Sequence, residues 1–401
     1  MLAGVVGLGA AAGLSFVSGW KAQFFGVYLS VYFFFLTLAL GGLFFVLLQF
    51  ASRSGWSITV RRMAEFIMGG FVPRLGKVTI PMMAILFIPV LFGLHTLYEW
   101  TDPKVMASHA ALTSKQAYLN LPFFLVRMVF YFGVWILMAR YFLSKSLEQD
   151  RTGDHELTKK MQARSYVGIA LFALTITFAG FDWIMSIDPH WYSTIFGVYM
   201  FAGANVAVYA TLALSFLGLQ RMNLIPTDVV TKEHLHAIGK MLFGFNVFWT
   251  YIAFSQFFLI WYANIPEETK WFAYRLSHKT GWMNFTYILV IGHFIIPFFF
   301  MMSRHIKRNN KLFAMSAVWL LLMHLLDMYW LIVPTLYEIY SHHHHLKHHL
   351  HFGIADVILL VTIFVGIGGF FLAAVTSWMS NNRLVANQDP RLSEALKMEN
   401  L

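Results

Sequence analysis

The residues best placed to do chemistry in this chain are a histidine and an aspartate inside the apolar stretch MHLLDMYWLIVP. His324 and Asp327 are three positions apart, so on a helix both would face the same neighbour. An ionisable pair is costly to bury in lipid surroundings, and proton transfer is a chemistry that such a pair commonly serves. Pro334 follows them, and because proline leaves the carbonyl of Trp330 without its helical partner, we expect water or a ligand to enter there.

Two further ionisable residues extend this pattern. Glu338 falls on nearly the same helix face about three turns beyond Asp327, which predicts an acidic track to the outer surface. His293 precedes Pro297 in the preceding apolar run and would extend the track inward. A lone buried histidine is also a common packing residue, so both interpretations of His293 stay open.

A second group of ionisable residues lies near the same membrane edge. His95 and Glu99 are four apart at the end of the run FIPVLFGLHTLYEW, which would put both on one helix face. Arg127 lies about two turns into the next apolar run, at a similar depth, so we expect it to pair with Glu99 or Asp182. Such a pair either locks helices together or takes part in function, and both roles stay open.

The stretch FAGFDWIMSIDPHWYSTIFGVYMFAG joins two long apolar runs through a short polar hinge. Pro189 disfavours helix at Asp188, so one helix should end there and the next should begin near Trp191. Asp188 and His190 would then lie at the membrane edge, flanked by aromatic rings of the kind found at membrane–water boundaries.

The composition indicates that a membrane protein positions these groups. The 401 residues are 58% hydrophobic and 12% charged, with a mean hydropathy of +0.62, which is far more apolar than a soluble domain of this length. Cysteine is absent, which excludes thiolate-held iron–sulfur clusters, covalent c-type haem and disulfides in this chain.

Apolar runs of about 20 residues predict an all-α, polytopic fold with about ten transmembrane helices. The runs cover residues 2–17, 24–50, 78–98, 121–143, 163–186, 192–219, 240–263, 281–303, 312–337 and 354–378. The first run is the weakest. Because no Lys or Arg precedes it, we expect a retained or truncated helix and not a signal peptide.

The basic residues predict the orientation of these helices. Of the 29 Lys and Arg residues, 18 lie in the connections after the second, fourth, sixth and eighth runs, and 7 lie in the alternate connections. By the positive-inside rule, the first set and both termini face the cytoplasm, and the hinge faces outward. The net charge of +10 therefore reflects topology, and no nucleic-acid partner is expected.

Histidines are concentrated in the segment SHHHHLKHHLH, on the outer side before the last run. Without a carboxylate or thiol framework, a solvated, proton-buffering or partner-contacting loop is expected there, and no metal site is predicted. A b haem would need facing histidines. His95, His293 and His324 are single residues on different runs, so haem is not expected, although pairing between runs stays open.

Three stretches together resemble the NrfD-like integral membrane subunits of alternative complex III, a quinol:cytochrome c oxidoreductase. They are DWIMSIDPHWYSTIFGVYMFAG, FIPVLFGLHTLYEW and HLLDMYW. Within that family the chain is most similar to the subunit described as the second quinone-binding subunit. The resemblance covers nearly the whole chain and is weakest over residues 1–20, the histidine-rich loop and the tail.

The resemblance implies a division of the chain into two bundles with flanking elements. These are a short first transmembrane helix or its remnant (1–20), a first four-helix bundle (21–190), a second four-helix bundle (191–340), the histidine-rich outer loop (341–353), a last transmembrane helix (354–380) and a cytoplasmic tail (381–401). In the tail, Asp389-Pro390 before Leu392 predicts a short capped helix.

The resemblance also implies an activity and partners. The complex oxidises a quinol, which is either menaquinol or ubiquinol, and passes the electrons to periplasmic-side iron–sulfur and c-haem subunits. This chain therefore needs no covalent cofactor. A sibling NrfD-like subunit shares the bacterial inner membrane and is the one more firmly associated with the quinol site. By position and chemistry, the acid–base set expected here is His95, Glu99, Asp182, His324 and Asp327.

Three function classes remain open. The first is a quinol-binding or proton-conducting subunit of a respiratory oxidoreductase, which would not be catalytic alone. The second is a secondary transporter or proton channel, which the prolines within the apolar runs would suit. The third is a cofactor-free scaffold that anchors partner subunits. The two predicted halves begin on the same side of the membrane, so they are not related as an inverted repeat. This weighs against the transporter interpretation, because many transporters are built from inverted repeats.

Overall fold

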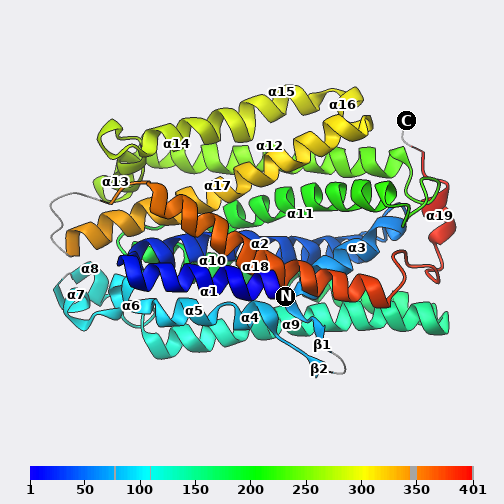
Figure 1. Cartoon of the computed structure of the whole chain (residues 1–401), viewed down its shortest axis with the longest axis horizontal. Helices are drawn as coiled ribbons and strands as arrows, with labels where there is room; N and C mark the ends of the chain where they lie inside the picture. The colour runs from blue at the N-terminus through cyan, green and yellow to red at the C-terminus, as the bar shows by residue number, and fades with distance from the viewer. Residues whose placement is uncertain (76–77, 109, 344–349, 400–401) are drawn as a thin grey trace.

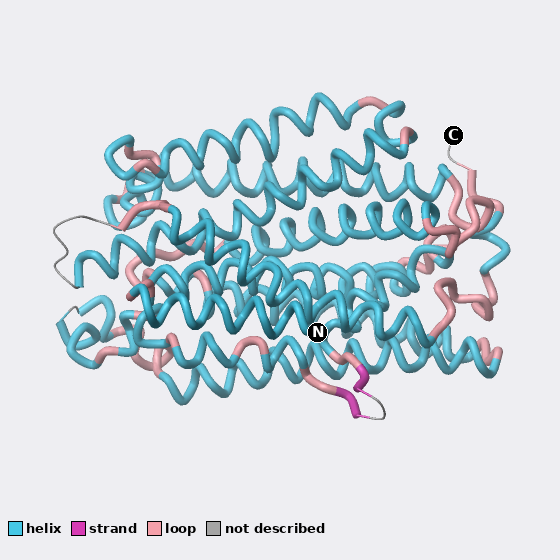
Figure 2. The backbone as a smooth tube through the Cα atoms, viewed as in Figure 1, coloured by secondary structure: helices cyan, strands magenta, loops and turns pink. Residues whose placement is uncertain are grey.

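The computed structural model describes residues 1–75, 78–108, 110–343 and 350–399. Long helices lie side by side along one axis, and the extended segments of the described chain are two short strands (Figures 1 and 2). These strands, β1 (Arg74–Leu75) and β2 (Val78–Thr79), form an antiparallel pair. The expected all-α, polytopic membrane fold is confirmed.

In the described part of the chain, eight helical stretches are long and apolar enough to cross a bilayer. They are α2 (Lys21–Ala51), α9 (Leu121–Thr152), α10 (Glu156–Trp183) with the 3₁₀ turn η3 (Met185–Ile187), α11 (Phe196–Arg221), α12 (Lys232–Ala263), α14 (Trp282–Leu289) with the π-helical η5 (Val290–Ile295) and α15 (Ile296–Met302), α17 (Asn310–His343) and α18 (Ile354–Asn381).

The remaining elements are shorter. They are α1 (Leu2–Ser18), α3 (Ile58–Met68), η1 (Gly69–Phe71), α4 (Met82–Ile85), α5 (Ile88–Phe92), α6 (Leu94–Leu97), η2 (Glu99–Thr101), α7 (Pro103–Ser108), α8 (Ala110–Thr113), α13 (Pro266–Arg275), η4 (His278–Thr280), α16 (Arg304–Arg308) and α19 (Leu392–Leu396). Elements α7, α8 and α13 lie at one end of the long helices, and α16 and α19 lie at the other (Figure 1).

Helices α2 and α11 form the centre of the molecule. α2 is the most deeply buried of the spans, and it packs against α3, α10, α11, α17 and α18. Gly41 makes the contact with α11 possible, because a Cβ there would collide with the Ala204 carbonyl and the Val208 side chain. At the edge of the molecule, α1 packs on α18 through small residues such as Gly7 and Gly366.

The expected third span, residues 78–98, is not one continuous helix. It consists of α4, α5 and α6, with Pro81 before the first piece and Pro89 at the start of the second. The phenol of Tyr28 donates to the carbonyl of Leu86 at 2.7 Å, and that of Tyr32 donates to Met83 at 2.8 Å. Side chains of α2 therefore satisfy backbone groups that the breaks release.

The charged stretch before this segment is buried. Arg61 and Arg62 lie in the connection after the second apolar run, on α3, which packs beside α2. Both guanidinium groups contact Glu65, at 3.1 and 3.0 Å, and Arg61 also binds Asp389 of the tail at 2.9 Å. Since Asp389 precedes the expected short helix α19, this ion pair joins the tail to the bundle.

The hinge is longer than predicted on one side only. The span formed by α10 and η3 ends at Ile187, just before Asp188 as predicted, but α11 begins at Phe196, five residues after Trp191. The Asp188 carboxylate accepts hydrogen bonds from the backbone N–H groups of His190, at 3.0 Å, and Trp191, at 3.3 Å. This local turn competes with helix formation and delays the start of α11.

Candidate functional site

Asp327, on α17, is a fully buried carboxylate held by neutral donors. The hydroxyl of Tyr199, on α11, donates to it at 2.5 Å, and the indole N–H of Trp249, on α12, donates at 3.3 Å. No cation in the described part of the chain lies within ion-pair distance of this carboxylate. A carboxyl group in such surroundings can bind or release a proton without breaking an ion pair.

His324 lies on the same helix, α17, but has a different hydrogen-bond partner. Its Nε2 lies 2.9 Å from the hydroxyl of Thr37 on α2, and that hydroxyl donates to the carbonyl of Phe34 at 2.8 Å. With the Thr37 proton donated to that carbonyl, Nε2 would donate to the hydroxyl oxygen and Nδ1 would be left as an acceptor. The prediction that His324 and Asp327 face one neighbour is right for packing, because both side chains lie against α11, whereas the hydrogen bond of His324 runs to α2.

His293 lies close to this group and is fully buried. Its ring packs on Trp249 with 3.8 Å between ring centroids, and neither ring nitrogen has a hydrogen-bond partner among the described residues. A side chain at Gly203 would meet both His324 and Trp249, so this glycine allows the two rings to approach. The structure thus brings together three of the sequence-predicted residues: His293, His324 and Asp327.

The eighth span is not a simple kinked helix around His293. Residues Val290–Ile295 form a π-helical turn, and Pro297 follows at the start of α15. The Asn246 amide donates to the carbonyl of His293 at 3.0 Å, and the Trp319 indole donates to that of Gly292 at 2.6 Å. Side chains of α12 and α17 therefore bind the carbonyls of this turn.

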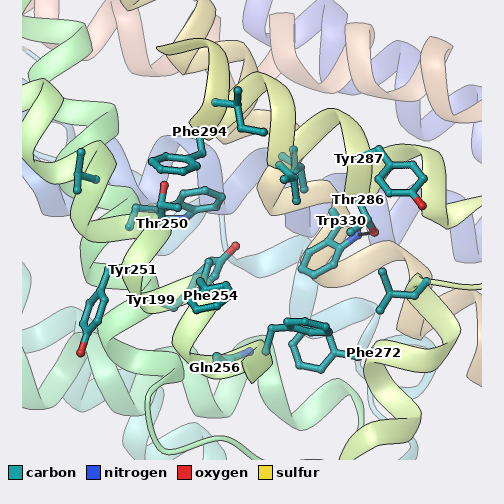
Figure 3. Close-up of a pocket in the computed structure, with 18 residues that line it drawn as sticks. Tyr199, Thr250, Tyr251, Phe254, Gln256, Phe272, Thr286, Tyr287, Phe294 and Trp330 are labelled. Carbon is teal, nitrogen blue, oxygen red and sulfur yellow. Dashed lines mark hydrogen bonds between the residues drawn. The ribbon is translucent and has the colours of Figure 1, made fainter. Parts of the chain in front are cut away.

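An apolar cavity of about 640 Å³ adjoins the buried acid. It lies between α12 and the α14–η5 stretch, with α13 and Trp330 of α17 at one end (Figure 3). Tyr199 and Trp249 line it, so Asp327 lies directly behind two of the lining residues. Tyr251 and Phe254 also line it and are mostly exposed on the outer face of α12. The cavity therefore reaches from the surface of the spans to the donors that hold Asp327.

The carbonyl released by Pro334 is not open to water or a ligand. Arg275, on α13, donates to the carbonyl of Trp330 at 3.2 Å, to that of Leu331 at 3.0 Å and to the Thr335 hydroxyl at 2.8 Å. The guanidinium also packs on the ring of Trp271, with 3.4 Å between its central carbon and the ring centroid. This corrects the predicted entry point, because a cationic side chain already occupies it.

Arg275 also interrupts the predicted acidic track. It binds α17 between Asp327 and Glu338, and Glu338 is half-buried with its carboxylate 3.9 Å from Lys270. Burial lowers the pKa of Arg275 to about 9, and the nearby carboxylates of Glu338 and Asp188 oppose that shift. Glu338 therefore belongs to a cationic environment at the end of the molecule and not to the group around Asp327.

The first half of the chain holds a closed ion pair. Arg127 binds Asp182 through two nitrogens, at 2.6 and 2.9 Å, and the Tyr131 hydroxyl donates to the same carboxylate at 2.7 Å. Of the two predicted partners of Arg127, the structure selects Asp182 and not Glu99. Both oxygens of Asp182 are thus engaged, which leaves this acid in a structural role.

The other edge residues do not assemble with this pair. His95 is exposed and contacts the Thr101 hydroxyl at 3.0 Å, whereas Glu99 lies 3.6 Å from His190. They do not share a helix face, because α6 ends at Leu97 and Tyr98 has an extended backbone. Residues 344–349 of the histidine-rich segment lie outside the described residues, so the interpretation of that loop stays a prediction.

No protein-family model and no curated protein matches this chain. The assignment of a function therefore depends on the geometry of the site itself. Tyr199, Trp249, Gln256 and Arg275 are the residues that the sequence interpretation missed. Each lies in an aromatic-rich apolar stretch or in a short connection. The spacing of such a residue in the sequence does not distinguish a functional residue from one that only packs or lies at the membrane interface.

Proposed function

We propose that this chain is a quinol-binding and proton-conducting membrane subunit of a respiratory quinol:electron-acceptor oxidoreductase of the alternative complex III type. Its partners would be a sibling membrane subunit and periplasmic-side iron–sulfur and c-haem subunits in a bacterial inner membrane. The observation that supports this most is the cavity, which runs from the surface of the spans to the donors around Asp327.

The chemistry of quinol oxidation fits this cavity. A quinol has an apolar tail that partitions into lipid, and its oxidation to quinone releases two protons and two electrons. The electrons would pass to the metal centres of the partner subunits. A proton leaving the bound ring would reach Asp327 through the Tyr199 hydroxyl, which hydrogen-bonds to it.

Beyond Asp327, the two buried imidazoles extend the proton route. His324 Nδ1 has no hydrogen-bond partner among the described residues, and His293 packs on Trp249, which donates to the acid. In the opposite direction, the Arg275 guanidinium would repel a migrating proton. This arrangement favours proton movement along α17 away from Arg275.

The transporter alternative is supported by the broken segment α4–α6, since substrates often bind at broken helices. The hydroxyls of Tyr28 and Tyr32 already donate to backbone carbonyls at the breaks of that segment, so these carbonyls are not free to bind a substrate. The cavity beside α12 has mainly apolar walls, which suits a ring with a lipid-soluble tail better than a polar solute.

The substitution Asp327→Asn tests the proposal in the assembled complex. It preserves the shape of the side chain and removes the proton acceptor, so quinol:cytochrome c turnover should fall by about a hundredfold or more while haem content stays normal. Glu338→Gln is the matched control, because Glu338 lies beyond Arg275 and its loss should leave turnover within about twofold. Normal turnover in a fully assembled Asp327→Asn complex would overturn the proposal.

A further inference from the structure

Gln256 presents an unsatisfied amide to the cavity. Its side chain is 3% exposed and lines the cavity with apolar neighbours such as Phe257 and Phe272 (Figure 3). The Oε1 atom has no hydrogen-bond partner among the residues that the structure describes. Since the bilayer interior offers no water to satisfy it, a buried amide at this position indicates a ligand with a polar group.

The other interior hydroxyls of the cavity already have partners. Thr250 donates to the carbonyl of Asn246 at 2.9 Å. Thr286 donates to the carbonyl of Arg275 at 3.1 Å and accepts from the Trp330 indole at 2.9 Å. The Gln256 amide is therefore the interior polar group of the cavity whose oxygen has no partner among the described residues, and the Tyr199 hydroxyl, which donates to Asp327, adds an oxygen acceptor that leads to the buried acid.

Gln256 follows Trp249 by seven residues, about two turns of α12, so the two side chains project from one face of that helix and both line the cavity. A ligand that contacts both the Tyr199–Asp327 end and the Gln256 amide therefore needs two separate polar groups. A six-membered ring with oxygens at opposite positions meets that requirement, and the aromatic walls of the cavity match its flat faces.

We infer that the cavity holds the ring of a 1,4-dihydroxy aromatic molecule between two opposed contacts, with one hydroxyl at the Tyr199–Asp327 end and the other at the Gln256 amide. This inference rests on the proposed function and identifies the residue that orients the substrate. The amide accepts from a hydroxyl and, after rotation, donates to a carbonyl, so it can bind both the quinol and the quinone. The amide serves as a hydrogen-bond partner of the ring in either redox state and takes no proton itself.

The experiment measures binding of two probes to the purified full chain in lipid nanodiscs. One probe is a 1,4-benzohydroquinone with a decyl tail, and the other is the same molecule without the hydroxyl expected at Gln256. The wild-type chain should bind the dihydroxy probe about tenfold more tightly, the gain from one hydrogen bond in an apolar site. Gln256→Met removes the amide at similar volume and should abolish this difference while binding the monohydroxy probe as the wild type does.

Thr250→Val is the matched control, because Thr250 lines the cavity from the same helix and its hydroxyl already donates within α12. The Thr250→Val chain should keep the tenfold preference for the dihydroxy probe. In the assembled complex, Gln256→Met should raise KM about tenfold and leave kcat unchanged. A tenfold preference retained in Gln256→Met would overturn the role of Gln256 but leave the cavity as a quinol site. A wild-type chain that binds neither probe would overturn the proposed function itself.

Discussion

Asp182 and Asp327 are both fully buried carboxylates on long apolar helices, yet their neighbours give them different roles. Asp182 binds the Arg127 guanidinium through two contacts, so its charge is neutralised in place. Asp327 has only the Tyr199 hydroxyl and the Trp249 indole as donors. A carboxylate stabilised by neutral donors can change its protonation state, whereas one fixed by a guanidinium loses an ion pair when it does.

This contrast predicts that Asp182 matters for stability. Asp182→Asn leaves the Arg127 guanidinium buried without its counter-charge, so the free energy of unfolding should fall by about 3–5 kcal/mol. Thermal unfolding of the detergent-solubilised chain measures this loss. Adding Arg127→Met to the same chain removes the unpaired charge and should restore most of the stability. An Asp182→Asn chain as stable as the wild type would show that the pair is dispensable.

At the scale of the elements, broken helices in this protein are completed by side chains from their neighbours. Tyr28 and Tyr32 of α2 bind carbonyls of the α4–α6 segment, and Asn246 binds one in the π-helical turn. Arg275 does the same for α17 at Pro334. Because no water is present in the lipid interior, each break needs such a partner.

The pairing of Arg275 with the Pro334 break predicts a specific rescue. Arg275→Met alone should lower the free energy of unfolding by about 1–3 kcal/mol, because the Trp330 carbonyl loses its donor. Pro334→Ala restores a backbone N–H that can donate to that carbonyl, so the double variant should recover part of the loss. Thermal unfolding of the single and double variants gives the coupling between them. Strictly additive effects would contradict this account of the break.

At the scale of the whole molecule, the connections rich in Lys and Arg lie at one end of the long helices, and the connections poor in them lie at the other end. Elements α7, α8 and α13 lie at one end, and α16 and α19 lie at the other (Figure 1). This arrangement is what alternating spans require. Which end faces the cytoplasm stays a prediction from the excess of Lys and Arg.

Single cysteines test that orientation, because the chain contains none of its own. Lys279→Cys, beside α13, should react with a membrane-impermeant thiol reagent on intact spheroplasts. Asp154→Cys, between α9 and α10, should react only after permeabilisation. Both positions are exposed, so a difference in labelling reports sidedness and not burial. The opposite labelling pattern would reverse the orientation.

The class of this protein and the positions of most of its spans could be predicted from the amino-acid sequence alone. Apolar runs of bilayer length are a local property of the chain, so eight helices lie where such runs were predicted. Their ends differ from the predicted ones by up to nine residues, at the end of α9. The predictions failed where a local pattern had two solutions. The run at residues 78–98 was apolar enough for one helix, but its prolines and the phenols of Tyr28 and Tyr32 support three short ones.

The grouping of the ionisable residues could not be predicted from the sequence, because it depends on how the helices pack. The spacing of His324 and Asp327 on one helix predicted that they form a pair. The donors to Asp327, however, come from α11 and α12, which are distant from α17 in the sequence. Likewise, the choice of Asp182 as the partner of Arg127 and the approach of Arg275 to Pro334 depend on contacts across helices. Helix periodicity determines the face on which a residue lies, whereas packing between helices determines what that face meets.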